Sequence, residues 1–242
     1  MNPKSSLKPI VLRMYATLLF GLLIVLVNQC ATVPEKAAVA PVQTNRFENA
    51  IRNFEQLDQE NPPEPGAILF VGSSSFRGWH SLEKDFPEYR VINRGFGGSE
   101  LSDVLYFFDR VVVPYQPRQI FLYEGDNDVA AGKSPKQILA DFQTFVGLVR
   151  QKLPGTPVVF ISVKPSASRK QFIGTMDTTN QLIQKYCLSQ NDLTYVDVFH
   201  PMLDQHDYPR SDIFGSDSLH MNAAGYNLWQ SIIAPYLMQE QP

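Results

Sequence analysis

The feature that most constrains the fold of this chain is an alternation of short apolar runs with amphipathic helical patterns from residue 66 onward. Most runs are continuously apolar and rich in β-branched or aromatic residues, as expected for strands covered on both faces. The predicted strands are Ala67–Val71, Arg90–Asn93, Ile120–Tyr123, Val158–Val163 and Leu193–Val198. The predicted helices lie near Arg46–Gln59, Leu101–Val112, Pro135–Lys152, Met176–Gln190 and Ala223–Leu237. This order predicts an α/β fold, a three-layer α/β/α sandwich around a five-stranded parallel sheet.

The composition supports one folded domain after an N-terminal segment. Apolar residues make up 44% of the chain, and no second composition regime appears after residue 66, so one core can be built. We predict a signal or anchor segment at 1–30, a flexible tether at 31–44 and a single domain at 45–242. Ligands bind outside the carboxyl ends of the strands in such sheets. Functional residues are therefore expected just after the first three strands and in the last loop.

The N-terminal segment has the charge order of a secretory signal. Residues 1–13 hold three positive charges and no negative ones, and Leu18–Val27 is almost continuously apolar. Cys30 follows this run directly, which looks like a bacterial lipoprotein signal with a lipidated cysteine. An incidental cysteine at the end of a signal or anchor is the alternative. We expect an extracytoplasmic protein held at the membrane by this segment, as a bacterial cell-envelope lipoprotein or by an anchor, with secretion as the alternative.

Charge and cysteine content narrow the functions and the covalent cross-links that this chain could have. Residues 31–242 carry 18 basic against 24 acidic residues, a net charge of −6, without the basic stripe that phosphate binding needs. Nucleic-acid binding is thus the least supported function. The second cysteine, Cys187, falls in a predicted helix. With Cys30 lipidated it is expected to be a small buried apolar residue, and no disulfide is predicted.

Three of the predicted strands are followed by polar or glycine-rich turns. Gly72-Ser73-Ser74-Ser75 places hydroxyls on a strand-to-helix turn, where a nucleophile can project into the crevice, although a plain capped turn is the commoner reading. Gly95, Gly97 and Gly98 follow the second strand and permit close backbone approach, or simply form a flexible loop. Tyr123–Asp128 follows the third strand and could bind metal, cap a helix or present an amide donor.

The last loop contains an acid and a histidine three residues apart. In Asp217-Ser218-Leu219-His220, one turn can bring the carboxylate to the imidazole Nδ1 and leave Nε2 to accept a proton. His80, His200 and His206 have no equivalent context, and we predict that they are structural or exposed.

These four elements, in this order, resemble the four blocks of the SGNH hydrolases, also called GDSL-type esterases and lipases, over roughly residues 66–237. Ser74, Gly98, Asn127 and His220 match the key residue of each block. The resemblance implies a flavodoxin-like α/β/α fold with Ser74 as nucleophile, His220 as base and Asp217 as its orienting acid. It assigns the oxyanion hole to the N–H groups of Ser74 and Gly98 and to the side-chain amide of Asn127.

Two positions depart from the family pattern. Ser73 stands where an acid usually precedes the nucleophile, and Ser99 stands where an acid often follows the second-block glycine. With three consecutive serines, the choice of Ser74 depends on the alignment, and Ser73 or Ser75 remains an alternative.

The function we expect is a serine esterase that hydrolyses carboxylic esters through an acyl-Ser74 intermediate, with no cofactor and no metal. Its substrate would be a small-molecule, lipid or polysaccharide ester, such as a simple ester, a lysophospholipid or a carbohydrate O-acetyl group. A membrane-anchored, non-catalytic binding protein of the same fold is one alternative. A metal-dependent hydrolase using the residues of His200–His220 is the other, although compact ligand spacing is missing there.

Four aromatic residues lie close in sequence to the predicted blocks. They can line an acyl pocket, although aromatics beside strands are more often part of the core. These residues are Phe76, Trp79, Phe96 and Tyr123.

Overall fold

The computed structural model describes residues 46–240, which fall within one compact unit. The predicted signal or anchor segment, the tether and Cys30 lie outside the described residues. Within residues 46–240, no helix has the length and apolar character needed to cross a membrane.

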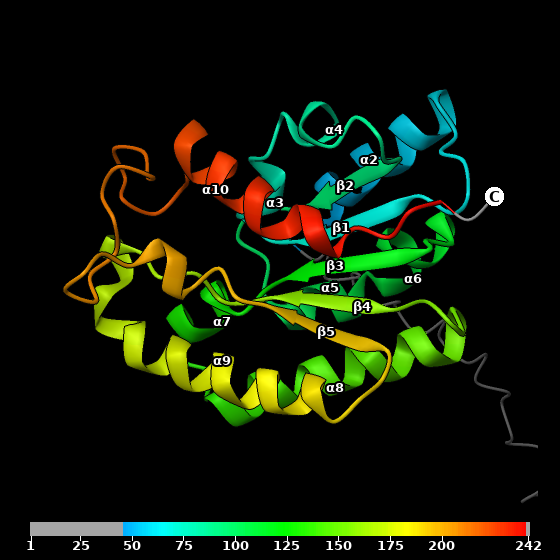
Figure 1. Cartoon of the computed structure of the whole chain (residues 1–242). Helices are drawn as coiled ribbons and strands as arrows, with labels where there is room; N and C mark the ends of the chain where they lie inside the picture. The colour runs from blue at the N-terminus through cyan, green and yellow to red at the C-terminus, as the bar shows by residue number, and fades with distance from the viewer. Residues whose placement is uncertain (1–45, 241–242) are drawn as a thin grey trace, which may run out of the picture. The chain divides into compact units, whose positions relative to one another are not determined.

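The centre of the fold is a five-stranded, all-parallel sheet in the order β2-β1-β3-β4-β5 (Figure 1). Each strand coincides with a predicted one within two residues, so the predicted sheet is confirmed. The strands are β1 Ile68–Gly72, β2 Val91–Gly95, β3 Gln119–Tyr123, β4 Val158–Ile161 and β5 Leu193–Val196.

The last two strands are shorter than predicted because backbone N–H groups just past their ends donate to side chains and not to a neighbouring strand. Val163 N–H donates to the side chain of Asn180 (2.8 Å), and Val198 N–H donates to Ser162 Oγ (2.9 Å). The apolar sequence continues past Ile161 and Val196, but the strand-to-strand pairing does not.

Helices cover both faces of the sheet. The helices are α2 Glu48–Glu60, α3 Ser74–Arg77, α4 Leu82–Asp85, α5 Leu101–Tyr106, α6 Phe108–Val111, α7 Asp126–Ala130, α8 Pro135–Lys152, α9 Ile173–Leu188 and α10 Ala223–Ile233. In Figure 1, α8 and α9 lie on one side of the sheet and α10 on the other. Alternate residues of β1 point into the two cores: Leu69 packs with the residues of α2, α5, α6, α8 and α9, and Phe70 with those of α3, α4 and α10. The predicted three-layer sandwich is confirmed.

The helices that were predicted best carry both a start signal and an apolar stripe. α8 begins at Pro135 after Ser134, whose hydroxyl accepts from Gln137 N–H, and its buried stripe includes Ile138 and Phe142. The short helices α3, α4 and α7 were not predicted, because four or five residues are too few to show a helical period. The predicted helix Leu101–Val112 is divided into α5 and α6 at Phe107.

The strand order locates the crevice in which a site can form. β1 lies between β2 and β3, so the connections from β1 and β3 leave in opposite directions and open a crevice at the carboxyl ends of these strands. Ser73 N–H donates to Tyr123 O (3.1 Å), which brings the two loops together. Gly72 is required at this turn, because its φ is +139° and a Cβ would lie 2.1 Å from Tyr123 O.

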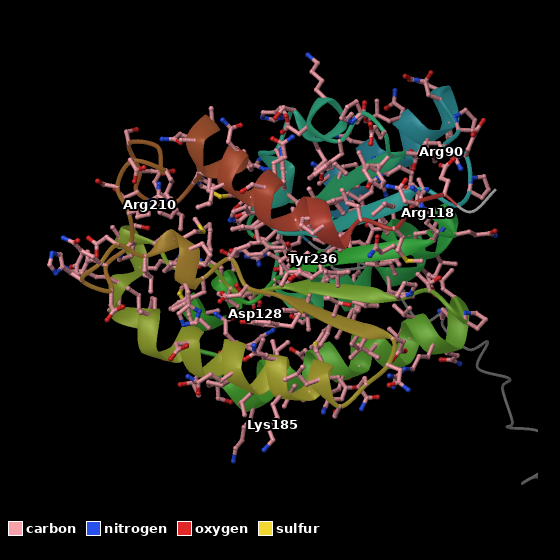
Figure 2. All side chains as sticks on the ribbon, viewed as in Figure 1. Arg90, Arg118, Asp128, Lys185, Arg210 and Tyr236 are labelled. Carbon is pink, nitrogen blue, oxygen red and sulfur yellow. The ribbon has the colours of Figure 1, made fainter. Side chains whose placement is uncertain are left out.

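The opposite end of the sheet holds the C-terminal segment. Arg90 and Arg118, labelled in Figure 2, precede β2 and β3, and each contacts a carboxylate oxygen of Glu240 (2.6 and 3.1 Å). The side chain of Gln119 donates to Tyr236 O (2.8 Å). These contacts are structural and lie at the amino ends of the strands, away from the crevice.

The four aromatic residues that could have lined an acyl pocket belong to the core. Phe76 and Tyr123 are fully buried, Trp79 and Phe96 are 1% exposed, and Tyr123 packs against Trp229 with ring centroids 5.1 Å apart. The pocket interpretation is therefore wrong, because these rings fill the space between the sheet and its helices. Cys187 is also buried, and burial raises the pKa of its thiol to about 12.

Candidate active site

The three consecutive serines occupy different environments. Ser73 and Ser75 are 1% and 3% exposed, whereas Ser74, the first residue of α3, is partly exposed. Ser73 Oγ also accepts a hydrogen bond from Asn127 Nδ2 (2.8 Å). Of the three hydroxyls, that of Ser74 is the one that a substrate can reach.

Asp217 and His220 form the predicted pair on the loop before α10. His220 Nδ1 lies 2.6 Å from Asp217 Oδ2, and the other carboxylate oxygen accepts the backbone N–H groups of Leu219 (3.0 Å) and His220 (2.9 Å). The hydrogen bond from His220, followed by these backbone bonds, holds the pKa of Asp217 well below its usual value. An ionised Asp217 favours a proton on Nδ1 and leaves Nε2 free to accept one.

The loop that carries His220 is connected to the loop that carries Ser74. Tyr226, in the first turns of α10, donates from its hydroxyl to Ser75 O (3.0 Å). No hydrogen bond joins Ser74 to His220 in the described part of the chain, and catalytic contacts of this kind often form only when substrate binds. The two side chains of the pair are half-exposed, 51% for Asp217 and 44% for His220, so a substrate has access to them.

The predicted oxyanion donors lie in the loops that follow β1, β2 and β3. Asn127 Nδ2 donates to Ser73 Oγ and to Ser99 O, each at 2.8 Å, so one amide joins the loops after β1 and β2. Gly98 has φ +85°, and a Cβ there would meet nothing within 4 Å, which leaves open space in front of it. Among residues 46–240, no acceptor pairs with the Gly98 N–H.

A second acid–histidine pair was overlooked in the sequence. His200 Nδ1 lies 2.6 Å from Asp197 Oδ2, and His200 N–H donates to Asp197 Oδ1 (3.2 Å), as in the Asp217–His220 pair. Asp197-Val198-Phe199-His200 has the same Asp-x-x-His spacing as Asp217–His220, so the prediction that His200 has no equivalent context is wrong. Its side chain is 70% exposed, and His80 and His206 are exposed as predicted.

The acids after β3 have separate roles. Asp128, labelled in Figure 2, is fully buried and accepts from the N–H groups of Gly125 (3.1 Å) and Leu101 (3.1 Å), and from Lys133 Nζ (2.8 Å). It therefore caps the first turns of α7 and α5, as the capping interpretation expected. Within the described residues, no three His, Cys, Asp or Glu side chains gather in a way that could hold a metal ion.

Two residues at the site were missed at the sequence level. Arg169 donates to Asp126 Oδ1 (2.6 Å) and to Asn127 Oδ1 (2.9 Å), and Lys164 donates to Asp126 Oδ2 (3.0 Å). Both basic residues follow β4, whose carboxyl end was left out of the predicted site. The general rule on strand ends would have included them.

Glu124 is a fully buried carboxyl group behind this site. Ser99 Oγ donates to Glu124 Oε1 (2.5 Å), and Glu124 Oε2 has no partner among the described residues. Burial, followed by the charge of Asp128, raises the pKa of Glu124 well above its usual value. Glu124 therefore holds its proton to a higher pH than an exposed glutamate does.

We predict that Glu124→Gln raises the free energy of unfolding relative to wild type, and that this difference grows as pH rises. The folded pKa of Glu124 lies above the unfolded value near 4.5, so unfolding releases a proton and becomes easier at higher pH. The stability advantage of Glu124→Gln should grow above pH 5, by at most about 1.4 kcal/mol per pH unit. Chemical denaturation at pH 5, 6.5 and 8 measures this. Glu88→Gln, at an exposed position, is the control, and a constant difference for Glu124→Gln would show that Glu124 is ionised in the fold.

Comparison with known proteins places most of the domain in one family. The family model for the GDSL-like lipase/acylhydrolase family matches residues 65–228. No curated protein that was compared matches the chain.

Several solved structures share the fold at low sequence identity. A Streptococcus pneumonia protein named after platelet activating factor has 21% identity and a TM-score of 0.72, over 93% of this chain and 99% of that chain. A GDSL-like lipase from Bacteroides thetaiotaomicron has 20% identity and a TM-score of 0.63, over 77% and 97%. A catalytic mutant of an acetylxylan esterase from Geobacillus stearothermophilus has 15% identity and a TM-score of 0.59, over 73% and 96%. The chain belongs to the GDSL-like lipase/acylhydrolase family of SGNH hydrolases, and it is a hydrolase of ester bonds.

Proposed function

We propose that this protein is a serine esterase that removes short acyl groups, such as acetyl, through an acyl-Ser74 intermediate. The observation that carries the proposal is the Asp217–His220 pair, 2.6 Å apart, on a loop whose following helix is bonded to the segment of Ser74. Ser74 is the reachable hydroxyl of its turn, and the amide of Asn127 is held beside that turn.

The proposed reaction needs only groups of this chain and water. Ser74 Oγ attacks the ester carbonyl carbon while His220 Nε2 takes its proton, and Asp217 stabilises the imidazolium. The carbonyl oxygen becomes an oxyanion that accepts hydrogen bonds from the N–H groups of Ser74 and Gly98 and from Asn127 Nδ2, which turns one N–H from Ser73 Oγ to the oxyanion. His220 then protonates the leaving alcohol, and the acyl group stays on Ser74. Water, activated by His220, attacks the acyl-enzyme and releases the carboxylic acid.

Two observations support a short acyl group. Four aromatic side chains close in sequence to the site residues are buried in the core, so they do not form an apolar channel for a long chain: Phe76, Trp79, Phe96 and Tyr123. The groups around Asn127 are polar: the hydroxyl of Ser73, the carbonyl of Ser99 and the guanidinium of Arg169. One fold neighbour is an acetylxylan esterase, which supports carbohydrate acetyl esters as the first class to test.

The experiment is hydrolysis of p-nitrophenyl acetate, butyrate and octanoate, and of acetylated xylan, by the full chain. We expect kcat/KM to fall with acyl length. A preference for octanoate, or hydrolysis of a lysophospholipid in place of the acetyl esters, would contradict the short-acyl proposal and favour a lipid ester.

We predict that Asn127→Ala lowers kcat about 10²- to 10³-fold with a small change in KM, because the lost donor acts on charge that develops in the transition state. Steady-state kinetics with p-nitrophenyl acetate measures this. Asn227→Ala, the same substitution at an exposed position of α10, should keep wild-type kinetics. An Asn127→Ala enzyme with wild-type kcat would remove Asn127 from the oxyanion hole.

A further inference from the structure

The guanidinium of Arg169 bridges two consecutive residues of α7. It donates from Nη1 to Asp126 Oδ1 (2.6 Å) and from Nη2 to Asn127 Oδ1 (2.9 Å). Arg169 lies in the short 3-10 segment Ala167–Phe172 after β4, and its side chain is only 18% exposed. The guanidinium can only donate hydrogen bonds, and it bonds to Oδ1 of Asn127, the residue whose Nδ2 is the predicted oxyanion donor.

This contact determines which way the amide of Asn127 faces. The two ends of an asparagine amide have nearly the same shape but opposite hydrogen-bonding roles. With Oδ1 held by Arg169, Nδ2 faces Ser73 Oγ and Ser99 O on the other side. The hydroxyl of Ser73 can donate or accept, so it does not select the orientation by itself. Arg169 and the carbonyl of Ser99 together exclude the reversed amide, which would point an oxygen at the oxyanion.

The charges around Arg169 act in the same direction. Asp126 is 7% exposed and lies between Lys164, 1% exposed, and Arg169. Although burial opposes it, the charges of Lys164 and Arg169 lower the pKa of Asp126, so one carboxylate faces two cations. The excess positive charge lies at the acceptor end of the Asn127 amide. It polarises this amide and makes Nδ2–H a stronger donor.

We propose that Arg169 is a positioning residue for catalysis: it holds Asn127 Oδ1 and polarises the amide toward the oxyanion without touching the substrate. The proposal rests on the proposed esterase function, in which Asn127 is an oxyanion donor. Arg169 acts through Asn127 alone, so its effect should disappear when Asn127 is removed. Loss of Arg169 leaves Asp126 bonded to Lys164, so the buried carboxylate keeps a partner.

The test is a double-mutant cycle on the full chain with p-nitrophenyl acetate. Arg169→Met should lower kcat about 10- to 100-fold with KM little changed. The reason is that Asn127, no longer held by Arg169, donates less well to the oxyanion of the transition state. Arg169→Lys keeps the charge but loses the two-pronged contact, so it should recover part of kcat. In the Asn127→Ala background, Arg169→Met should cost little more. Equal losses in both backgrounds, or a change in KM alone, would overturn the proposal.

Two controls separate positioning from a general structural effect. Arg150→Met removes an arginine that bonds Asp192 (2.6 and 2.8 Å) and should leave kcat and KM unchanged. The pH profile of kcat/KM in Arg169→Met should keep its shape. A shifted profile would indicate that the change acts on the His220 loop instead, which the 169 segment reaches through Ser168 N–H and Ser218 O (3.2 Å).

A readout that needs no activity keeps this proposal apart from the proposed function. The side-chain amide signals of Asn127 in an ¹⁵N-labelled sample are identified by their loss in Asn127→Ala. In Arg169→Met the two amide protons should shift and exchange faster with water. Unchanged signals would overturn the positioning role whatever the chain hydrolyses. Changed signals in a chain inactive on all esters would support the positioning role and count against the esterase.

Discussion

Ser74→Ala is expected to lower kcat/KM on p-nitrophenyl acetate by about 10⁴-fold or more, because the two neighbouring serines of its turn are buried and cannot replace it as the nucleophile. Ser74 is partly exposed, whereas Ser73 and Ser75 are buried. The measurement is kcat/KM, with thermal unfolding to show that the variant is folded. Residual activity should be insensitive to an organophosphonate, since the nucleophile that the reagent modifies is gone.

The neighbouring serines provide matched controls for this prediction. Ser75→Ala should stay close to wild type, because the Ser75 hydroxyl has no part in the proposed reaction. Ser73→Ala should show an intermediate loss, because Ser73 Oγ accepts from Asn127. Mass spectrometry of the phosphonate adduct should place the modification on Ser74. An adduct on Ser73, or the largest loss in Ser73→Ala, would make Ser73 the nucleophile. A wild type that is neither labelled nor active would favour a non-catalytic binding protein.

His220→Ala is expected to lower kcat by a similar factor, about 10⁴-fold or more, and Asp217→Asn by up to about 10⁴-fold. Without the imidazole, the Ser74 proton has no acceptor. Without the carboxylate, the imidazolium loses its stabilising partner and Nδ1 its acceptor. The effect of Asp217→Asn should be the smaller one, because the pair is half-exposed and water screens its charges. The imidazole position is open to solvent, so added imidazole should restore part of the activity of His220→Ala.

The second acid–histidine pair of this chain is the control for these variants. Asp197 and His200 repeat the spacing and the 2.6 Å contact of Asp217 and His220. His200→Ala and Asp197→Asn should therefore retain kcat and KM near wild type. A large loss in His200→Ala together with activity in His220→Ala would transfer the role of base to His200.

Much of the fold could be predicted because it is recorded in local patterns. Val158–Ile161 and the stripe of α8 are apolar at positions that a strand and a helix bury, and such periodicities depend only on neighbours along the chain. The order of these elements then limits the topology to a parallel sheet, whose carboxyl ends hold the candidate site. The positions of Ser74, Asn127 and His220 at those ends followed from the sequence in the same way.

Side-chain environments were decided only by the tertiary structure. The sequence presents three equivalent serines, and burial by the sheet and helices distinguishes Ser74 from its neighbours. Arg169 lies 42 residues from Asn127, and no local pattern relates the two. The raised pKa of Glu124 likewise depends on burial by segments distant in the chain. Sequence by itself therefore determined the order of elements and the end of the sheet that holds the candidate site, because these follow from local hydrophobic periodicity and chain connectivity. Only the folded structure decided which groups are reachable, charged and held in position there, because solvation and hydrogen bonding arise between segments that meet on folding.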